Sequence, residues 1–299
     1  MNAREISKPR RLVDRRRRVL IWRLVITLVI LGGLLGGLVV FLRLPVLAIK
    51  NIEVQGASAL DKAELAAVAE SVLQNNFTGL FPRKNFLIYP RRQIKEILSE
   101  RFQRIEQMSL KVEEDNILVV EIKERQGEYL WCGLEPLEPD PSGECFFTDA
   151  QGYIFDQAPY FSGNVYFKIY GPPAQAGLPA QAGPPAQAGP LYNSSATSHI
   201  GSQVFPPEDF IRLMEFKHRM ETLRLAPVYF WIKQEGECVA RGSAGFEIFF
   251  LCTGNLEETA ENLSAALQAE PFAPDYEKRL PDLLYLDLRH DNKVFFKLK

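Results

Sequence analysis

A charge-free apolar run behind a basic cluster constrains this chain more than any other feature. Residues 24–42 contain no charged side chain. As a helix with a rise of about 1.5 Å per residue, they reach roughly 30 Å, enough to cross the apolar core of a bilayer. Residues 1–23 hold nine Lys or Arg against two acidic residues. Because positive charge resists translocation, residues 1–23 are predicted to be a cytoplasmic tail, residues 24–44 a transmembrane helix, and the rest exported.

A cleaved signal peptide is the main alternative interpretation of this run. Its apolar region would be shorter, about 7–15 residues, and small residues would mark the cleavage point. Here residues 41–45 read Phe-Leu-Arg-Leu-Pro, which lacks that pattern. We therefore expect an uncleaved anchor in a single-pass cell-membrane protein of type II, with its N-terminus in the cytoplasm. The GxxxG spacings Gly32/Gly36 and Gly33/Gly37 fit either a helix-packing face or the ordinary composition of membrane helices.

Charge and cysteine usage both differ between the two parts of the chain. Residues 1–50 carry 11 basic and 2 acidic groups, a net charge of +9, which leaves 24 basic and 35 acidic groups, a net charge of −11, beyond them. An acidic exported part argues against nucleic acid as a partner. All four cysteines lie in the exported part, where Cys132 and Cys145, and likewise Cys238 and Cys252, flank a turn-rich loop. Two disulfides and four buried thiols both remain open.

Hydrophobic periodicity predicts a small α/β unit at residues 47–125. A short strand covers residues 49–54, and Asp61 with Glu64 has the spacing of a helix-capping box. The apolar stripe of that helix consists of Leu65, Val68, Ala69, Val72 and Leu73. Pro90 suits the start of a second helix. Alternation over 108–112 and 118–122, around a turn at 115–116, predicts a hairpin. The predicted order is strand, helix, helix, strand, strand.

Beyond residue 125 the pattern changes to short strands. They are expected at 129–132, 145–148, 153–156 and 164–170, and again at 228–233, 237–241, 246–252 and in the closing segment, with helices at 208–224 and after Asn255. A Pro-Ala-Gln-Ala-Gly repeat recurs from Pro173. Because such a composition cannot bury a core, residues 171–206 are predicted to be a disordered insertion in a β domain spanning 126–299.

The order of these segments resembles the FtsQ/DivIB family of bacterial cell-division proteins. The resemblance lies in the strand-helix-helix-strand-strand unit directly after one anchor helix, in residues 52–56, 85–88 and 118–125, in the Asp-x-x-Gly step at 149–152, and in Tyr-Leu-Asp-Leu-Arg at 285–289. It implies an α+β protein: one transmembrane helix, a POTRA domain (β-α-α-β-β) at 47–125, and a mixed, β-rich C-terminal domain with two helices.

The same resemblance implies a scaffold at the division septum. Its partners would be membrane proteins of the divisome, FtsB- and FtsL-like and FtsW- and FtsI-like, recruited by strand addition to an edge strand around residues 294–297. The partner-binding residues that the resemblance implies are Tyr285, Arg289, His290, Val294, Phe295 and Phe296. A membrane-anchored cell-wall enzyme and a POTRA-type chaperone of exported polypeptides are the alternatives.

Motifs that carry catalysis are missing from the sequence. There is no GxSxG, no P-loop and no HExxH, and three histidines without a CxxC make a zinc site improbable. We therefore expect no enzyme activity, no cofactor and no metal. Asp287 and Arg289, two apart on one predicted strand, share a face and are expected to form a structural pair on the surface.

Overall fold

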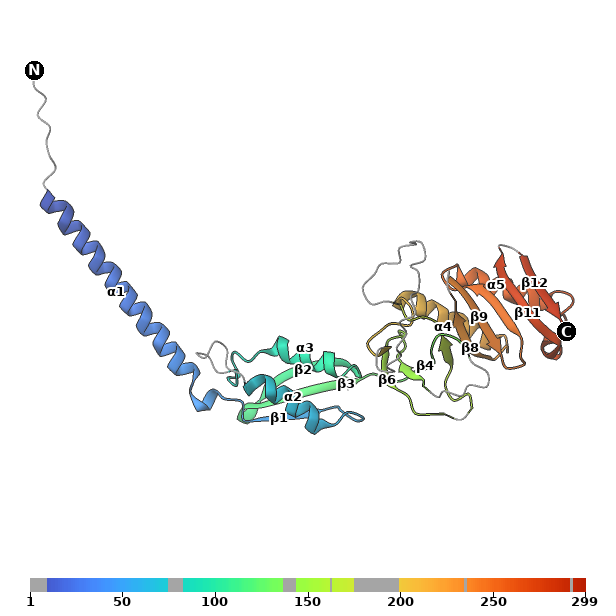
Figure 1. The fold of residues 1–299 in the computed structure, drawn as a ribbon, viewed down its shortest axis with the longest axis horizontal. Coiled ribbons are helices and arrows are strands. Elements are labelled where there is room, and N and C mark those ends of the chain that lie inside the picture. Colours follow the sequence, from blue (N-terminus) through green and yellow to red (C-terminus); the bar gives the residue numbers. More distant parts are fainter. Residues whose placement is uncertain are drawn as a thin grey trace, which may run out of the picture. The chain divides into compact units, whose positions relative to one another are not determined.

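A computed structural model describes residues 10–74, 83–136, 144–161, 163–174, 199–233, 236–290 and 293–299. The chain divides into two compact units, residues 1–124 and 125–299. The predicted boundary at 125/126 lies one residue from this division. The fold class is α+β, with one long apolar helix at the N-terminus and a large mixed β-sheet in the second unit (Figure 1).

Helix α1 (Arg10–Leu42) contains the apolar run. Its segment Arg17–Leu42 is long and apolar enough to cross a membrane, and the described side chains of that segment are almost all exposed. The helix begins well before the predicted span of 24–44 and ends two residues earlier. A helix with an apolar surface and no protein packed around it is typical of a membrane anchor rather than of a soluble core.

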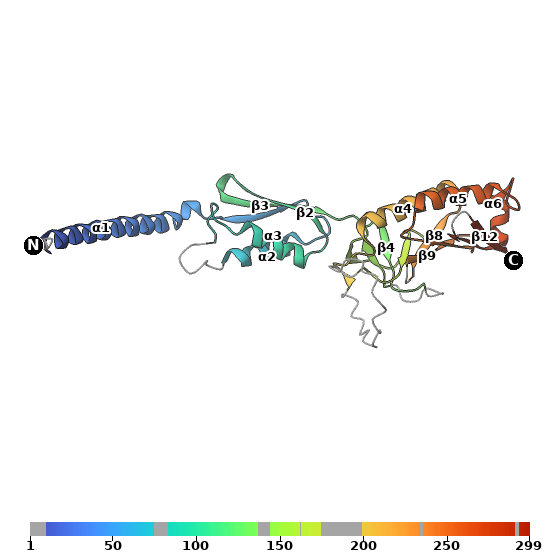
Figure 2. The same ribbon diagram turned by 90° about the horizontal axis from the view of Figure 1, so that it is seen from above.

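The rest of the first unit is a small sheet covered by two helices. Its elements are η1 (Pro45–Leu47), β1 (Asn51–Gln55), α2 (Lys62–Gln74), α3 (Arg91–Arg101), β2 (Ile105–Glu113), η2 (Glu114–Asn116) and β3 (Ile117–Glu124). In the described residues, β3 is central, parallel to β1 and antiparallel to β2. Figure 2 shows α2 and α3 on the same side of this sheet. The five apolar stripe residues predicted for the first helix are the buried residues of α2.

The carboxylate of Glu124 ties the end of β3 to the loop between β1 and α2. It accepts hydrogen bonds from the backbone N–H groups of Ser58 (2.7 Å), Ala59 (3.0 Å) and Leu60 (3.0 Å). Burial, the largest single influence, raises the pKa of Glu124, but these donors together outweigh it and hold the pKa below its ordinary value. The interaction therefore needs the charged carboxylate.

Replacing Glu124 by glutamine is expected to destabilise the first unit by about 1–3 kcal/mol, because an amide nitrogen would then face backbone donors. Since the pKa is lowered in the folded state, the stabilisation is present above the unfolded carboxyl pKa and is lost as the pH falls through the folded value. Hydrogen exchange of residues 51–74 at pH 7 and pH 3 measures both effects. Glu113→Gln, a change at an exposed position on the neighbouring strand β2, is the control, and equal protection in both variants would contradict the assignment.

The second unit is built on one long sheet. Its strands are β4 (Tyr129–Trp131), β5 (Phe146–Thr148), β6 (Ile154–Gln157), β7 (Lys168–Tyr170), β8 (Pro227–Ile232), β9 (Glu237–Gly242), β10 (Glu247–Leu251), β11 (Leu283–His290) and β12 (Lys293–Leu298). Among the described residues the order is β12-β11-β10-β9-β8-β7-β4-β5-β6. The pairs β4/β7, β7/β8 and β10/β11 are parallel and the others antiparallel.

Helices lie along one face of this sheet (Figure 2). They are α4 (Pro207–Thr222), α5 (Leu256–Gln268) and the single turn α6 (Tyr276–Arg279), which continues into η5 (Leu280–Asp282). The prediction of two helices missed α6. Aromatic rings fill the layer between helices and sheet: Phe216 of α4 lies 4.8 Å from Phe250 of β10, centroid to centroid, and Phe250 lies 5.6 Å from Phe230 of β8.

The predicted disordered insertion at 171–206 is too wide at both ends. Residues 171–174 and 199–206 are described, and Ala174 pairs with Gln203 in a β-bridge. Val204 is buried in the core, and Ser202 accepts a backbone hydrogen bond from Ile154. The prediction was wrong here because composition averages over a segment, whereas backbone hydrogen bonds and the burial of Val204 order its ends. Residues 175–198, which contain the repeat except for Pro173 and Ala174, lie outside the described residues.

Candidate functional site

Strand β12 forms one outer edge of the large sheet. It pairs with β11 on its inner side, with Leu286 opposite Phe296 and Asp287 opposite Phe295. Phe295 and Phe296 are 50% and 42% exposed, so two neighbouring aromatic side chains of this strand are open to solvent. An edge strand carries unpaired backbone groups and is a template for a further strand. The combination of a backbone edge and exposed aromatic side chains makes β12 the candidate site.

The opposite edge, β6, is less open. Ser202 accepts a hydrogen bond from the backbone N–H of Ile154, and Gly201 donates one to the Ile154 carbonyl, at 2.9 and 2.8 Å. The segment around residues 201–204 therefore occupies part of the outer side of β6. Of the two edges of the described sheet, β12 offers the longer stretch of strand.

The side chains of β12 divide between the two faces of the sheet. Val294 and Leu298 pack against the core beneath the helices, and Phe296 contacts Phe272 with ring centroids 5.1 Å apart. Phe295 points to the other face, where its ring lies 5.2 Å from that of His290. The predicted binding residues thus occupy one edge but two faces: Val294 and Phe296 lie on the helix side, and Tyr285, Arg289 and Phe295 on the open side.

Arg289 of β11 lies on the open face of the sheet, next to this edge, and binds two carboxylates there. Its guanidinium donates to both carboxylate oxygens of Asp287, at 2.9 and 2.6 Å, and to Glu237 of β9 at 2.8 Å. Its plane also lies 5.3 Å from the ring centroid of Phe249 in β10. Asp287 is 8% exposed, so the prediction that this is a surface pair was wrong. Asp287 is the buried member of the pair, whereas the side chain of Arg289 is 30% exposed. The contacts of Arg289 with Glu237 and Phe249 link β11 to β9 and β10.

This network shifts the pKa values of both partners. The hydrogen bonds from Arg289 lower the pKa of Asp287, and the hydrogen bonds to Asp287 and Glu237 raise the pKa of Arg289. Both shifts favour the charged forms, so the pair is ionised at pH 7. An ionised pair whose groups hydrogen-bond each other argues for a structural role beside the edge.

Arg289→Ala is expected to lower the free energy of unfolding of the second unit by about 2–3 kcal/mol, because the buried carboxylate of Asp287 loses its cation. Arg241→Ala is the matched control: Arg241 and Arg289 have the same side-chain exposure, 30%, and among the described residues Arg241 pairs with Glu247, whose side chain is 38% exposed against 12% for Asp287. Its loss is expected to cost less than about 1 kcal/mol. Urea unfolding at pH 7 measures both values. A loss as small for Arg289→Ala as for Arg241→Ala would contradict the assignment.

A stack of rings and cations that the sequence did not reveal continues across the open face. The ammonium of Lys233 lies 4.3 Å from the centroid of the Trp231 ring and 5.7 Å from that of Phe249. Phe249 in turn contacts Tyr285 edge-on at 5.9 Å. Cation–π contacts of this kind hold side chains on an uncovered sheet face. Sequence analysis missed them because β8, β10 and β11 meet only after the sheet has formed.

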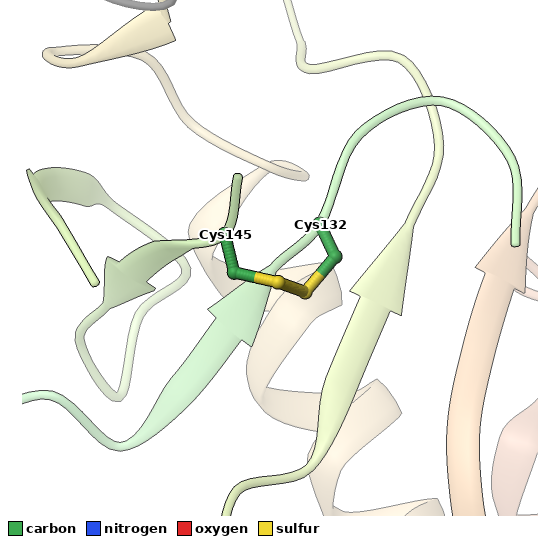
Figure 3. The surroundings of a disulfide bond; sticks show 2 residues. All are labelled: Cys132 and Cys145. Carbon is green, nitrogen blue, oxygen red and sulfur yellow. A yellow bond between two sulfur atoms is a disulfide. The ribbon is translucent and has the colours of Figure 1, made fainter. Parts of the chain in front are cut away.

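The four cysteines form two disulfides. Cys132 is joined to Cys145, across the end of β4 and the start of β5 (Figure 3), and Cys238 to Cys252, across β9 and the end of β10. Cys238 and Cys252 are fully or almost fully buried beneath the helices, whereas Cys132 is partly exposed. The Cys238–Cys252 disulfide thus links β9 to the end of β10. Strand β10 pairs with β11, which in turn pairs with the edge strand β12.

A polar groove of about 590 Å³ lies between α4 and α5. Arg212, Glu215 and Arg219 line the wall formed by α4, and Glu257 and Glu261 line the wall formed by α5. A lining that carries both signs of charge does not select an anion or a cation. In the described part of the chain, no cluster of three or more His, Cys, Asp or Glu residues is arranged to hold a metal ion.

Neither a scan against protein-family models nor a search of curated proteins found a match to this chain.

Proposed function

We propose that this protein is a membrane-anchored division scaffold of the FtsQ/DivIB type. The order of elements supports the proposal: one apolar helix, then a β-α-α-β-β unit, then a large mixed sheet whose last strand is an outer edge. In this proposal residues 47–125 are a POTRA domain, α1 is a type II anchor with a cytoplasmic N-terminus, and the exported units act at the septum. The basic residues before the apolar run support this orientation.

The single observation that carries the proposal is the open edge of β12 with its two exposed phenylalanines. A segment of an FtsB- or FtsL-like partner would add to β12 by backbone hydrogen bonds and extend the sheet. FtsW- and FtsI-like proteins would then be recruited to the same complex. Exposed edge strands are usually protected by charge, and Lys293 and Lys297 flank the two phenylalanines. Charge repulsion between these lysines would oppose pairing with a second copy of β12. A partner strand with acidic residues at its ends would instead be attracted.

Specificity follows from the two faces of β12. A strand added beside it places alternate side chains over Phe296 and the helix layer, and over Phe295 and His290 on the open face. Apolar residues are therefore favoured on both faces of the partner segment, with acidic residues opposite Lys293 and Lys297.

Depletion of the protein in its native cell, with a fluorescent fusion as the only copy, tests the proposal. We expect the fusion to gather at division sites and depleted cells to form filaments without septa. Uniform membrane fluorescence together with normal division after depletion would refute a scaffold role in division.

A further inference from the structure

In the first unit, exposed apolar side chains lie close to the C-terminal end of α1. Leu44 and Val46, just after the helix, are 44% and 75% exposed, and Leu87 and Ile88 are 57% and 43% exposed. Within the described part of 49–124, Leu87 and Ile88 are the large apolar residues with exposed side chains. We call these four residues the juxtamembrane patch. Their concentration at one end means that they are not the scattered surface apolar residues expected of any protein.

Hydrogen bonds hold both halves of the patch at the end of α1. The side-chain amide of Asn85 donates to the carbonyl of Leu42, the last residue of α1, at 2.7 Å, and its oxygen accepts from Leu87 N–H at 2.8 Å. Phe86 N–H donates to Leu47 at 2.9 Å. Asn85 is 1% exposed, so this connection is shielded from water. Leu87 and Ile88 therefore cannot lie far from the point at which α1 would leave a membrane.

We propose that the juxtamembrane patch inserts into the outer leaflet of the membrane that α1 spans, at the boundary between headgroups and acyl chains. The inference rests on the membrane anchoring within the proposed function. The patch follows α1 directly, so a membrane that α1 spans lies next to these four side chains. A lipid surface is therefore the binding partner that we propose for the patch. Shallow apolar insertion of this kind anchors proteins at a membrane interface.

Charges around the patch indicate that insertion depends on apolar area. Basic groups are present at Arg43, Lys50, Arg83, Lys84 and Arg91, and Lys84 pairs with Glu70 at 3.3 Å. Acidic Glu114 and Asp115 lie at the same end, because the next residue, Asn116, donates its side-chain amide to the Val46 carbonyl at 2.6 Å. The basic groups can add electrostatic attraction to anionic lipid, but the four apolar side chains of the patch need no lipid charge to insert. Insertion is therefore expected in uncharged and anionic vesicles alike.

Spin labels on the full-length protein in phosphatidylcholine vesicles free of other proteins test the proposal. Since all four native cysteines are in disulfides, a maleimide label reacts with a single introduced cysteine. The test positions are Leu87→Cys and Ile88→Cys. Glu114→Cys is the matched control, at the same end but on a polar turn, and Ser99→Cys is an exposed position on α3. Collisions with oxygen report lipid, and collisions with a water-soluble nickel complex report solvent.

The oxygen-to-nickel ratio at positions 87 and 88 is expected to exceed that at 114 and 99 by about threefold or more. Val46→Asp, a change at an exposed site that leaves the core intact, should lower the ratio at 87. Ratios at 87 and 88 equal to that at 114 would overturn the proposal and leave the patch to a protein partner. A high ratio only in anionic vesicles would also overturn it, in favour of electrostatic attraction.

A label at Leu34→Cys, in the middle of α1, separates this inference from the proposed anchoring. A solvent-exposed label at 34 means that α1 does not span the bilayer, and the anchoring itself fails. A lipid-exposed label at 34 with solvent-exposed labels at 87 and 88 refutes insertion of the patch alone.

Discussion

If the proposed scaffold function holds, replacing Phe295 and Phe296 together by aspartate is expected to reduce recovery of the proposed FtsB-like partner by about tenfold or more. In the free protein these side chains are about half exposed, so two carboxylates there remain hydrated. A partner strand added to β12 would strip that water from them without supplying cations, because its own residues are expected to be apolar or acidic. The measurement is affinity recovery of the full-length protein from its native membranes, with the partner quantified by mass spectrometry.

The matched control places the same two charges elsewhere on the same unit. Tyr160 and Val165 are 74% and 66% exposed and follow β6, at the other end of the sheet. Tyr160→Asp/Val165→Asp should leave recovery unchanged. Unfolding temperatures of both variants establish that the units stay folded. Recovery lost equally in the two double variants, or in neither, would remove β12 from the proposed mechanism.

Loss of the Cys238–Cys252 disulfide, by Cys238→Ala/Cys252→Ala, is expected to cost the second unit about 3–4 kcal/mol. Closing a loop of about 15 residues contributes roughly 3 kcal/mol through the unfolded chain, and removing two buried sulfur atoms adds a smaller packing loss. Urea unfolding of the oxidised protein, followed by tryptophan fluorescence, measures the change. The strands that this bond joins also support β11, so partner recovery should fall with stability.

Cys132 and Cys145 provide the comparison, because their separation of 13 residues nearly equals the 14 of the other pair. The chain-entropy contribution is therefore almost the same, and burial alone distinguishes the two bonds. Under a mild reductant we expect Cys132–Cys145 to open first in the folded protein, and Cys238–Cys252 to open only as the unit unfolds. Simultaneous reduction of both bonds without unfolding would show that the buried pair is not shielded.

Local patterns predicted the elements of the first unit well. The stripe of α2 depends on helical spacing alone, and the turn at Asp115-Asn116 depends on two residues that tolerate positive φ, observed at 62° and 61°. In the second unit, Asn255 begins α5 as expected, since its side chain accepts the backbone hydrogen bond of Glu258. These features involve residues within a few positions of one another, so the sequence contains the information needed to predict them.

Features that join residues distant in the chain could not be predicted from the sequence. The cysteine pairing stayed open because it depends on which strands become neighbours. Arg289 and Asp287 were expected at the surface, and Glu237, 52 residues earlier in the chain, was not foreseen as their partner. The sequence did not predict the ordered ends of the insertion, because Val204 is buried in a core formed by residues that are distant in the chain.

The sequence by itself determined that the chain has one apolar helix behind a basic tail, followed by two regions of different strand and helix pattern, because charge, hydropathy and short-range periodicity are properties of neighbouring residues. Only the tertiary structure decided which strand is the open edge and which side chains surround it. Strand order is a matter of long-range pairing, and parallel neighbours such as β10 and β11 are separated in the chain by α5, α6 and η5. The juxtamembrane patch has the same origin, since residues 44–46 and 87–88 meet only through the fold.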